Sequence, residues 1–329
     1  MAAMLAYGMN AEPTGRTGLT PHAARPAPAA RPSRDLRAVV QGLRGEVRFN
    51  EPLKDLTSFH IGGPADVLVY PADVEDVARL VRQAGHEKVP VFVIGGTNLL
   101  VRDRGIGGVV VSLSRLHAIR DEPNQVVYAE AGVGMPTLMK YAMSRSLAGL
   151  EWAAGIPGTL GGCVVMNAGT RLGEMSAVLK AVRVVDPQGT VVDCPASAIR
   201  FSYRRAKLPQ GIVVGAWLQL KAGDREAIET TVKDYLRHRK ETQPLALPSA
   251  GCVFKNPPND AAGRLIEAVG LKGARIGDAQ VSEKHANFVV NLGQARAADV
   301  IALIKKVGRT VEEQTGVTLE LELKIVGRP

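Results

Sequence analysis

The feature that most constrains this chain is a glycine-rich segment near its middle, AAGIPGTLGGCVVMNAG. Its glycines surround a few rigid or polar anchors, so that Gly155, Gly158, Gly161, Gly162 and Gly169 lie among Pro157, Thr159 and Asn167. Glycine buries no side chain, but it lets the backbone come close to a ligand. The whole chain has 35 glycines in 329 residues, which exceeds the usual ~7%. The sequence therefore predicts loops of unusual backbone geometry.

A second glycine segment, VIGGTNLLV, follows an apolar run that is typical of a buried strand. Gly95, Gly96, Thr97 and Asn98 come directly after that run, where successive N–H groups can converge on an anion. A glycine pair after a strand is by itself more often a simple turn, but the other glycine-rich loop favours a phosphate cradle. Neither segment matches the GxGxxG fingerprint or the phosphate loop that ends in GKS or GKT, which indicates a different nucleotide-binding fold.

The charge balance indicates small phosphate-bearing ligands rather than nucleic acid. The net charge is +9, but only 4% of the residues are aromatic, and no run of Lys and Arg forms a basic arm. Three cysteines without metal-ligand spacing argue against a disulfide framework and for a reducing cytosol. The six histidines show no metal or triad spacing, and no apolar run reaches the ~18 residues that cross a bilayer. We therefore expect a soluble, cytoplasmic protein without a metal site.

The apolar patterns predict a tail followed by alternating strands and helices. Residues 1–33 are rich in Ala, Pro, Arg and Gly without apolar periodicity, so we expect a disordered tail. We expect helices over residues 73–86 and around residues 229–241, and a last helix that stops at Gly316. A hairpin is expected over residues 181–195.

The terminal segment TLELELKIV alternates strictly, which predicts a strand with leucines on one face and Glu320, Glu322 and Lys324 on the other. On such a strand a glutamate usually belongs to a solvated face. Two more clusters, PSAGCVFKNP and FSYRRAKL, contain Cys252 and Arg204. Taken alone, Cys252 is more often a small buried residue, and Arg204 is more often a surface or ion-paired arginine.

The order of these motifs resembles the UDP-N-acetylenolpyruvoylglucosamine reductase family. The resemblance covers residues 53–327 and rests on TSFHIGGPADVLVYP, IGGTNLLVRDRGIGGVVV, GLEWAAGIPGTLGGCVVMNAG, FSYRRA, QPLALPSAGCVFKNP and GVTLELELKIVG. No long insertion separates the KNP and HANFVVN motifs, as in the shorter of the family's two forms. The resemblance implies an α+β protein with a vanillyl-alcohol-oxidase-like (PCMH-type) FAD-binding fold. Two FAD-binding subdomains would span residues 34–112 and 113–224, and a C-terminal α+β substrate domain would span residues 225–329.

The resemblance also implies a reaction. NADPH would reduce a non-covalently bound FAD, and UDP-N-acetyl-enolpyruvoylglucosamine would be reduced to UDP-N-acetylmuramate for peptidoglycan synthesis in the cell wall. The implied FAD contacts are Gly95, Gly96, Thr97, Asn98, Leu99, Gly155, Ile156, Pro157, Gly158, Thr159, Gly162 and Asn167. We expect small-molecule partners only, with no nucleic acid and no membrane, and a monomer.

Three residues match catalytic positions of the family. Arg204 would bind and polarise the substrate carboxylate, and Glu322 would hydrogen-bond or help protonate that group. Cys252 stands where the family usually has Ser and would donate a proton, for which a thiol with a reference pKa of about 8.5 is well suited. Substrate contacts are implied for Tyr203, Lys255 and Asn256.

Two departures and two alternatives accompany this interpretation. Ala206 replaces the usual Ser of the Tyr-Arg motif, which puts a supporting hydrogen bond in doubt, and Cys163 is interpreted as a packing residue. An oxidase of the same flavoprotein superfamily is one alternative, but it would leave the AGCVFKNP and Tyr-Arg motifs unexplained. A nucleic-acid-binding module is the other, and it would bind with a steep salt dependence.

Overall fold

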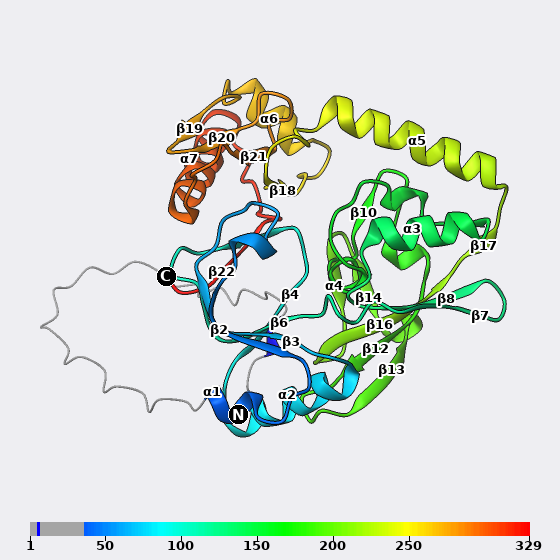
Figure 1. Ribbon diagram of the computed structural model, residues 1–329. Helices are drawn as coiled ribbons and strands as arrows, with labels where there is room; N and C mark the ends of the chain where they lie inside the picture. Colours follow the sequence, from blue (N-terminus) through cyan, green and yellow to red (C-terminus); the bar gives the residue numbers. More distant parts are fainter. Residues whose placement is uncertain (1–4, 7–35) are drawn as a thin grey trace, which may run out of the picture.

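The computed structural model describes residues 5–6 and 36–329 and arranges them around three larger sheets (Figure 1). The predicted disordered tail, residues 1–33, lies outside the described residues except for β1 (Leu5–Ala6), which pairs in parallel with the first sheet. Within the described residues, no helix is long and apolar enough to cross a membrane.

The first sheet has the strand order β1-β4-β6-β3-β2, in which β4, β6 and β3 run parallel and β2 pairs antiparallel with β3. Its longer strands are β2 (Glu46–Pro52), β3 (Pro64–Tyr70), β4 (Val91–Ile94) and β6 (Ile106–Ser112). The short helix α1 (Leu36–Val40) packs on α2 (Val74–His86), and the turn η1 (Lys54–Leu56) follows β2. Asp73 caps α2 by accepting a hydrogen bond from the Asp76 N–H, which confirms the predicted helix and its start.

The second sheet is antiparallel, with the order β13-β12-β16-β8-β7. Its strands are β7 (Ile119–Glu122), β8 (Val126–Glu130), β12 (Leu179–Val185), β13 (Val191–Pro195) and β16 (Ile212–Gln219). The predicted hairpin is confirmed, because β12 and β13 pair from Ala181 to Pro195. The turn between them contains Gly189, whose φ of +76° favours glycine. The helices α3 (Met135–Ser144) and α4 (Leu160–Met166) belong to this part of the chain.

Short elements complete the second part. They are the strands β9 (Leu147–Ala148), β10 (Gly169–Thr170), β11 (Gly173–Glu174), β14 (Arg200–Ser202), β15 (Arg205–Lys207) and β17 (Lys221–Ala222). Three single turns accompany them, η2 (Glu151–Ala153), η3 (Met175–Ala177) and η4 (Ala196–Ala198).

The third sheet, β18-β21-β20-β19, is reached through the long helix α5 (Arg225–Thr242), which runs along the top of Figure 1. Its strands are β18 (Ser249–Cys252), β19 (Arg275–Ile276), β20 (Ala279–Val281) and β21 (Phe288–Asn291). It is accompanied by α6 (Ala262–Ala268) and α7 (Ala297–Thr315). The last helix ends at Gly316 with φ +71°, as the sequence predicts.

The terminal strand is shorter than the alternation predicts. Only β22 (Lys324–Val326) is a strand, and it pairs in parallel with β5 (Leu99–Val101) of the first domain. Before it, a single bridge joins Leu321 to Phe254. Leu321 is 37% exposed, whereas the side chain of Glu322 is only 16% exposed, so Glu322 departs from the solvated face that is usual for a glutamate on such a strand. The third domain thus returns to the first through its last residues.

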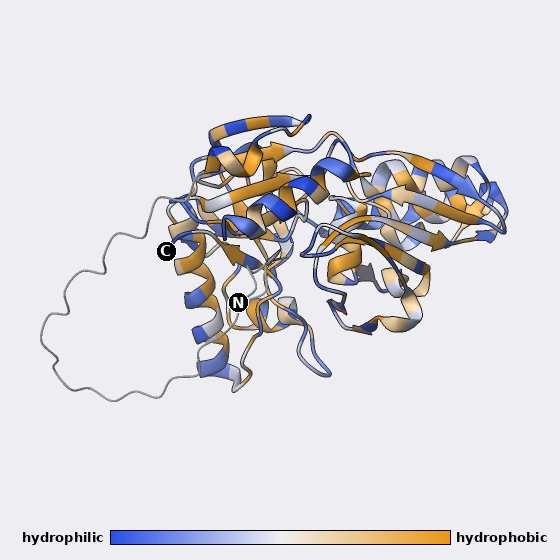
Figure 2. Ribbon diagram, turned by 90° about the horizontal axis from the view of Figure 1, so that it is seen from below, coloured by the Kyte–Doolittle hydropathy of each residue, from blue (hydrophilic) through white to orange (hydrophobic). Residues whose placement is uncertain are grey.

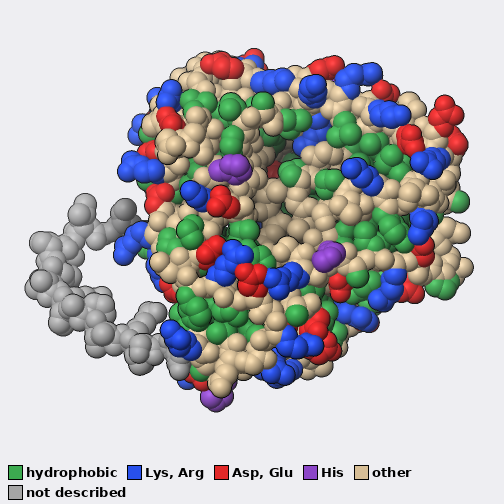
Figure 3. Space-filling model, in the orientation of Figure 1, with side chains coloured by type: hydrophobic (Ala, Val, Ile, Leu, Met, Phe, Trp, Pro, Cys, Tyr) green, Lys and Arg blue, Asp and Glu red, His purple; other side chains and the backbone are tan. Residues whose placement is uncertain are grey.

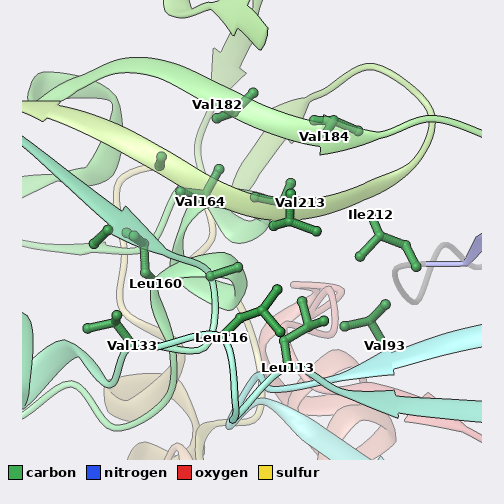
Figure 4. Packing of buried hydrophobic residues seen from close by; sticks show 14 of the residues in the cluster. Val93, Leu113, Leu116, Val133, Leu160, Val164, Val182, Val184, Ile212 and Val213 are labelled. Atoms are coloured by element: carbon green, nitrogen blue, oxygen red, sulfur yellow. The ribbon is translucent and has the colours of Figure 1, made fainter. Parts of the chain in front are cut away.

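One apolar cluster joins the first two domains, and another fills the third. In Figure 4, Val93 of β4 lies near Leu113 and Ile212, while Leu160 and Val164 of α4 pack toward β12 and β16. In Figure 2, the strands in the middle of the molecule contain stretches of hydrophobic residues. The domain limits at residues 112 and 224 stay predictions; β6 ends at Ser112, and α5 begins at Arg225.

Candidate active site

A cavity of about 470 Å³ is lined by residues from all three parts of the chain, and Figure 3 shows this hollow near the middle of the face. The loop after β4 contributes Gly95, Gly96, Thr97 and Asn98, and the glycine-rich segment contributes Ile156, Pro157, Gly158, Thr159 and Gly162. Arg204, Cys252 and Glu322 line the same cavity. The structure therefore brings the two predicted glycine loops and the three predicted catalytic residues to one site.

The two glycine loops pack against each other so closely that a side chain at the contact would push them slightly apart. A Cβ at Gly162 would lie 3.1 Å from the Gly95 carbonyl oxygen, and one at Gly158 would lie 3.3 Å from Thr97. Gly158 also has φ +102°, a conformation that favours glycine. Within residues 36–329, the N–H groups of Gly96, Thr97 and Asn98 donate to no protein acceptor. These loops are suited to bind a diphosphate. Their N–H groups can donate to its oxygens, and residues 95–98 and 156–162 contribute no carboxylate to the cavity that would repel it.

Arg204 occupies the two-residue turn between β14 and β15, which pair at Ser202 and Arg205. Its φ of +58° is uncommon for a residue with a side chain, and such backbone conformations cluster at functional sites. The Nη1 atom donates to the Gly169 carbonyl oxygen at 2.8 Å. The Nε atom lies 2.9 Å from Oε1 of Glu322, although its N–H does not point at that oxygen. One guanidinium edge is therefore close to a carboxylate inside the cavity.

Asn167 holds the turn that carries Arg204. It is fully buried at the C-terminal end of α4, where its φ is +43°. Its side-chain amide donates to the Ser202 carbonyl oxygen at 3.2 Å and accepts from the Ser176 N–H at 2.9 Å. Both the N–H and the carbonyl group of the amide thus bond to the protein. Asn167 therefore does not line the cavity, and it holds the turn of Arg204 in position.

Cys252 ends β18, directly after Gly251, whose φ is +76°. Burial raises the pKa of the Cys252 thiol to about 12, and the carboxylate of Glu322 acts in the same direction. Arg204, Arg239 and a hydrogen bond from Asn287 lower that pKa. The thiol is therefore protonated at neutral pH. Cys163 also lines the cavity, but it is 5% exposed within the core, where burial raises its pKa to about 12.

Glu322 reaches the cavity because the irregular segment before β22 lies against the chain that follows β18. The Glu322 N–H donates to the Val253 carbonyl oxygen at 2.9 Å, and the Asn98 side chain donates to the Glu322 carbonyl oxygen at 3.3 Å. Burial raises the pKa of the Glu322 carboxyl, whereas Arg204 and Lys255 lower it. Asn98 thus connects the first glycine loop to a candidate catalytic residue.

Several predicted site residues do not line this cavity. Leu99 lines a smaller neighbouring cavity, and Gly155 lines neither of the two. Among the predicted substrate contacts, Tyr203 is 51% exposed, and Lys255 forms an ion pair with Glu320. The Asn256 side chain accepts a hydrogen bond from the Ala262 N–H at 3.1 Å, at the start of α6. The parts of Tyr203, Lys255 and Asn256 in substrate binding stay predictions.

The structure also adds cavity residues that the motifs did not indicate. The helix α5 presents a stripe at helical spacing, formed by Tyr235, His238, Arg239 and Thr242, and Gln243 directly follows the helix. The sequence contains a signal for these residues. They recur at helical spacing in a helix whose buried residues are only Ile228 and Val232, so this face could have been predicted to contact something other than the core. His285 also lines the cavity beside Phe288, with ring centroids 4.8 Å apart, and burial lowers its pKa.

Comparisons with known proteins agree with this geometry. The profile of the FAD binding domain matches residues 65–195, and that of the UDP-N-acetylenolpyruvoylglucosamine reductase C-terminal domain matches residues 243–326. UDP-N-acetylenolpyruvoylglucosamine reductase 2 of Symbiobacterium thermophilum is 47% identical over 89% of this chain and 96% of its own length. The reductase of Caldanaerobacter subterraneus subsp. tengcongensis is 45% identical over 86% of this chain and 94% of its own. This chain belongs to the UDP-N-acetylenolpyruvoylglucosamine reductase family.

A solved structure supports the same assignment. The crystal structure of UDP-N-acetylenolpyruvylglucosamine reductase from Thermus caldophilus has a TM-score of 0.73 and 39% identity, covering 86% of this chain and 99% of that one. The family assignment confirms the α+β FAD-binding fold with a substrate domain and an enzyme that uses FAD with NADPH as reductant. It favours the reductase of peptidoglycan synthesis over the oxidase.

Proposed function

We propose that Arg204, Cys252 and Glu322 carry out the reduction of UDP-N-acetyl-enolpyruvoylglucosamine to UDP-N-acetylmuramate in this chain. The observation that supports it most is that these three residues share one cavity with the glycine loops. When FAD is bound there, it supplies the hydride from NADPH that is added to the methylene carbon of the enolpyruvyl group. The chain acts as a monomer in the cytoplasm.

Arg204 binds the carboxylate of the enolpyruvyl group. Addition of hydride to the methylene carbon pushes negative charge onto that carboxylate, so a fixed cation beside it stabilises the transition state. The guanidinium is planar and already fixed by the Gly169 carbonyl oxygen, which leaves its remaining N–H groups to orient the ligand. Glu322, whose pKa is raised by burial, hydrogen-bonds or protonates the same group.

Cys252 then supplies the proton that completes the reduction. Its S–H bond breaks, and a C–H bond forms at the carbon next to the carboxylate. A thiol with a pKa of about 12 is fully protonated at neutral pH, so the acid form is present in every molecule. The thiolate that remains recovers a proton from water before the next turnover.

The reaction is tested by following the visible flavin band of the purified protein without oxygen. We expect NADPH to bleach the band and UDP-N-acetyl-enolpyruvoylglucosamine to restore it, with one equivalent of UDP-N-acetylmuramate formed. A band that NADPH bleaches but the substrate never restores contradicts the proposal. Denaturing the protein provides a separate check, because a colour that stays with the chain indicates the covalent flavin of the oxidase.

A further inference from the structure

Arg239 is a half-buried guanidinium on α5 that faces the cavity without a carboxylate partner. Its Nη1 atom donates to the Ala154 carbonyl oxygen at 3.2 Å, and its Nε atom donates to the Gln243 side-chain oxygen at 3.2 Å. Across residues 36–329, no Asp or Glu lies within ion-pair distance of it. Burial lowers its pKa, but a guanidinium stays charged in proteins. A positive charge fixed by two neutral oxygens therefore lies in the cavity wall.

The glycine-rich loop leaves room for this side chain. Gly155 has φ +72°, and a Cβ there would lie 3.3 Å from the Cδ and Nε atoms of Arg239 and 3.1 Å from Leu236. A larger residue would push the guanidinium away from Ala154. Gly155 was predicted as a cofactor contact, and the loop that contains it also fixes the position of Arg239.

The charges near Cys252 oppose each other. Arg204, Arg239 and Glu322 line the same cavity as Cys252, so two cations and one carboxylate act on its thiol. Burial and Glu322 disfavour the thiolate, whereas Arg204 and Arg239 favour it. The charge of Arg204 is offset by Glu322 at 2.9 Å, whereas the described residues place no carboxylate within ion-pair distance of Arg239. The other titratable groups in the cavity wall come from four elements or loops and are Tyr235, His238, His285, Cys163 and Arg171.

We propose that Arg239 is a positioning residue that stabilises the thiolate of Cys252. The effect of Arg239 on catalysis rests on the proposed function, in which Cys252 gives its proton to the substrate carbon and the electron pair of the S–H bond stays on sulfur. The product of that step on the protein is a buried anion, and burying an unpaired anion is costly. Arg239 lowers that cost while Arg204 is occupied with the substrate carboxylate and Glu322.

The charge on Cys252 can be measured without any turnover. In a Cys163→Ala, Cys194→Ser background, Cys252 is the only thiol of the chain. The FAD-loaded protein without substrate is treated with iodoacetamide between about pH 7.5 and 9.5, where only the thiolate reacts, and the rate is followed by intact mass. Arg239→Gln should slow the alkylation about tenfold, since one pKa unit changes the thiolate fraction tenfold. Arg239→Lys keeps the charge and should stay within about threefold of the parent protein.

Two further variants control this experiment. Arg171→Gln removes an exposed cation at the tip of the β10–β11 hairpin and should change the rate by less than about twofold, because solvent screens it. Arg239→Met keeps the length of the stem beside Gly155 and serves as a second neutral variant if Arg239→Gln does not retain FAD. A shorter side chain at residue 239 could also give iodoacetamide better access to Cys252. That would raise the alkylation rate, so it cannot produce the expected decrease.

Equal alkylation rates in the parent and in the neutral variants would overturn the proposal. Equal losses in Arg239→Lys and Arg239→Gln would overturn it too, because they indicate packing rather than charge. Alkylation requires neither NADPH nor substrate, so its outcome stands apart from the reaction. A failure of the proposed function appears instead as a flavin band that the substrate cannot restore.

Discussion

The cavity has two walls that offer a ligand different chemistry. The cofactor wall, residues 95–98 and 156–162, has no charged side chain and presents backbone N–H groups between closely packed glycines. The catalytic wall, formed by Arg204, Cys252 and Glu322, presents half-buried titratable groups that change one another's pKa. The first wall can bind but cannot transfer a proton, and the second can do both. Substitutions in the two walls should therefore damage different half-reactions.

The largest expected effect tests whether the catalytic wall acts only on the substrate. Cys252→Ala should slow reoxidation of the flavin by substrate, or formation of product, by about 10² to 10⁴, which is typical for loss of a general acid. Flavin content and reduction by NADPH should stay near those of the wild type, since neither needs an acid at this position. Stopped-flow measurement of each half-reaction, with solvent deuterium incorporation into product, separates the two.

Cys252→Ser is the matched variant for this experiment. It keeps a proton donor and is the residue that the family resemblance implies at this position, so it should rank close to the wild type and far above Cys252→Ala. If Cys252→Ala forms product at the wild-type rate, Cys252 is a packing residue, and the proton must come from Glu322 or water.

A smaller effect is expected within the terminal segment. Glu322→Gln removes a buried carboxylate 2.9 Å from Arg204 and should slow substrate reduction by about 10². Glu320→Gln changes an exposed carboxylate that pairs with Lys255, and a surface pair is worth about 1 kcal/mol at most, so its effect should stay within about fivefold. Steady-state kcat and KM of both variants check this. Similar losses in the two variants would mean that Glu322 has no special place at the substrate.

These two glutamates also show what the sequence could predict. The motif order placed Glu322, Cys252 and Arg204 at one site, and the structure brings them together. The alternation of TLELELKIV predicted a regular strand, but bonds to Val253 and Asn98 bend the segment so that Glu322 turns inward. Those bonds join residues far apart in the chain, and the period of a short segment does not contain them.

The cavity stripe of α5 was missed for a related reason. A polar helical face usually belongs to solvent, and Arg239 differs from its neighbours only because the Gly155 loop lies against it. The helix itself, the last helix with its glycine stop and the hairpin over residues 181–195 were predicted correctly. Local sequence patterns were thus enough to predict the helices and the hairpin. Which of their faces line the cavity depends on contacts between residues far apart in the chain.

The cofactor wall is tested by adding one methyl group. In Gly162→Ala the new Cβ would lie 3.1 Å from the Gly95 carbonyl oxygen, so the loops must separate slightly. Overpacking costs about 1–3 kcal/mol. If this cost falls on the FAD-bound state alone, it corresponds to a roughly 5-fold to 150-fold weaker FAD affinity. The fold should survive, because alanine favours a helix over glycine. Titration of the apoprotein with FAD gives the Kd.

Gly134→Ala is the control for this substitution. Gly134 has φ −66°, and a Cβ there would meet its nearest atoms, Thr137 and Pro136, at 3.8 and 3.9 Å. The FAD affinity of this variant should equal that of the wild type. An unchanged affinity in Gly162→Ala as well would show that close packing of the two loops is not required for the cofactor.

The smallest effect is expected outside both walls, at the N-terminal segment. Residues 1–33 lack apolar periodicity, and the one described pairing in this segment is that of β1 with β4, over Leu5 and Ala6. Deleting residues 1–33 should change the unfolding free energy by no more than about 2 kcal/mol, since the described pairing of this segment is two residues long and a hydrogen bond contributes about 1 kcal/mol. Deletion of residues 1–4 alone keeps β1 and isolates its contribution. Chemical denaturation of both variants, together with kcat, measures the effect. A loss of several kcal/mol that appears only when β1 is removed would show that this strand completes the first sheet, and the segment would then belong to the FAD-binding domain.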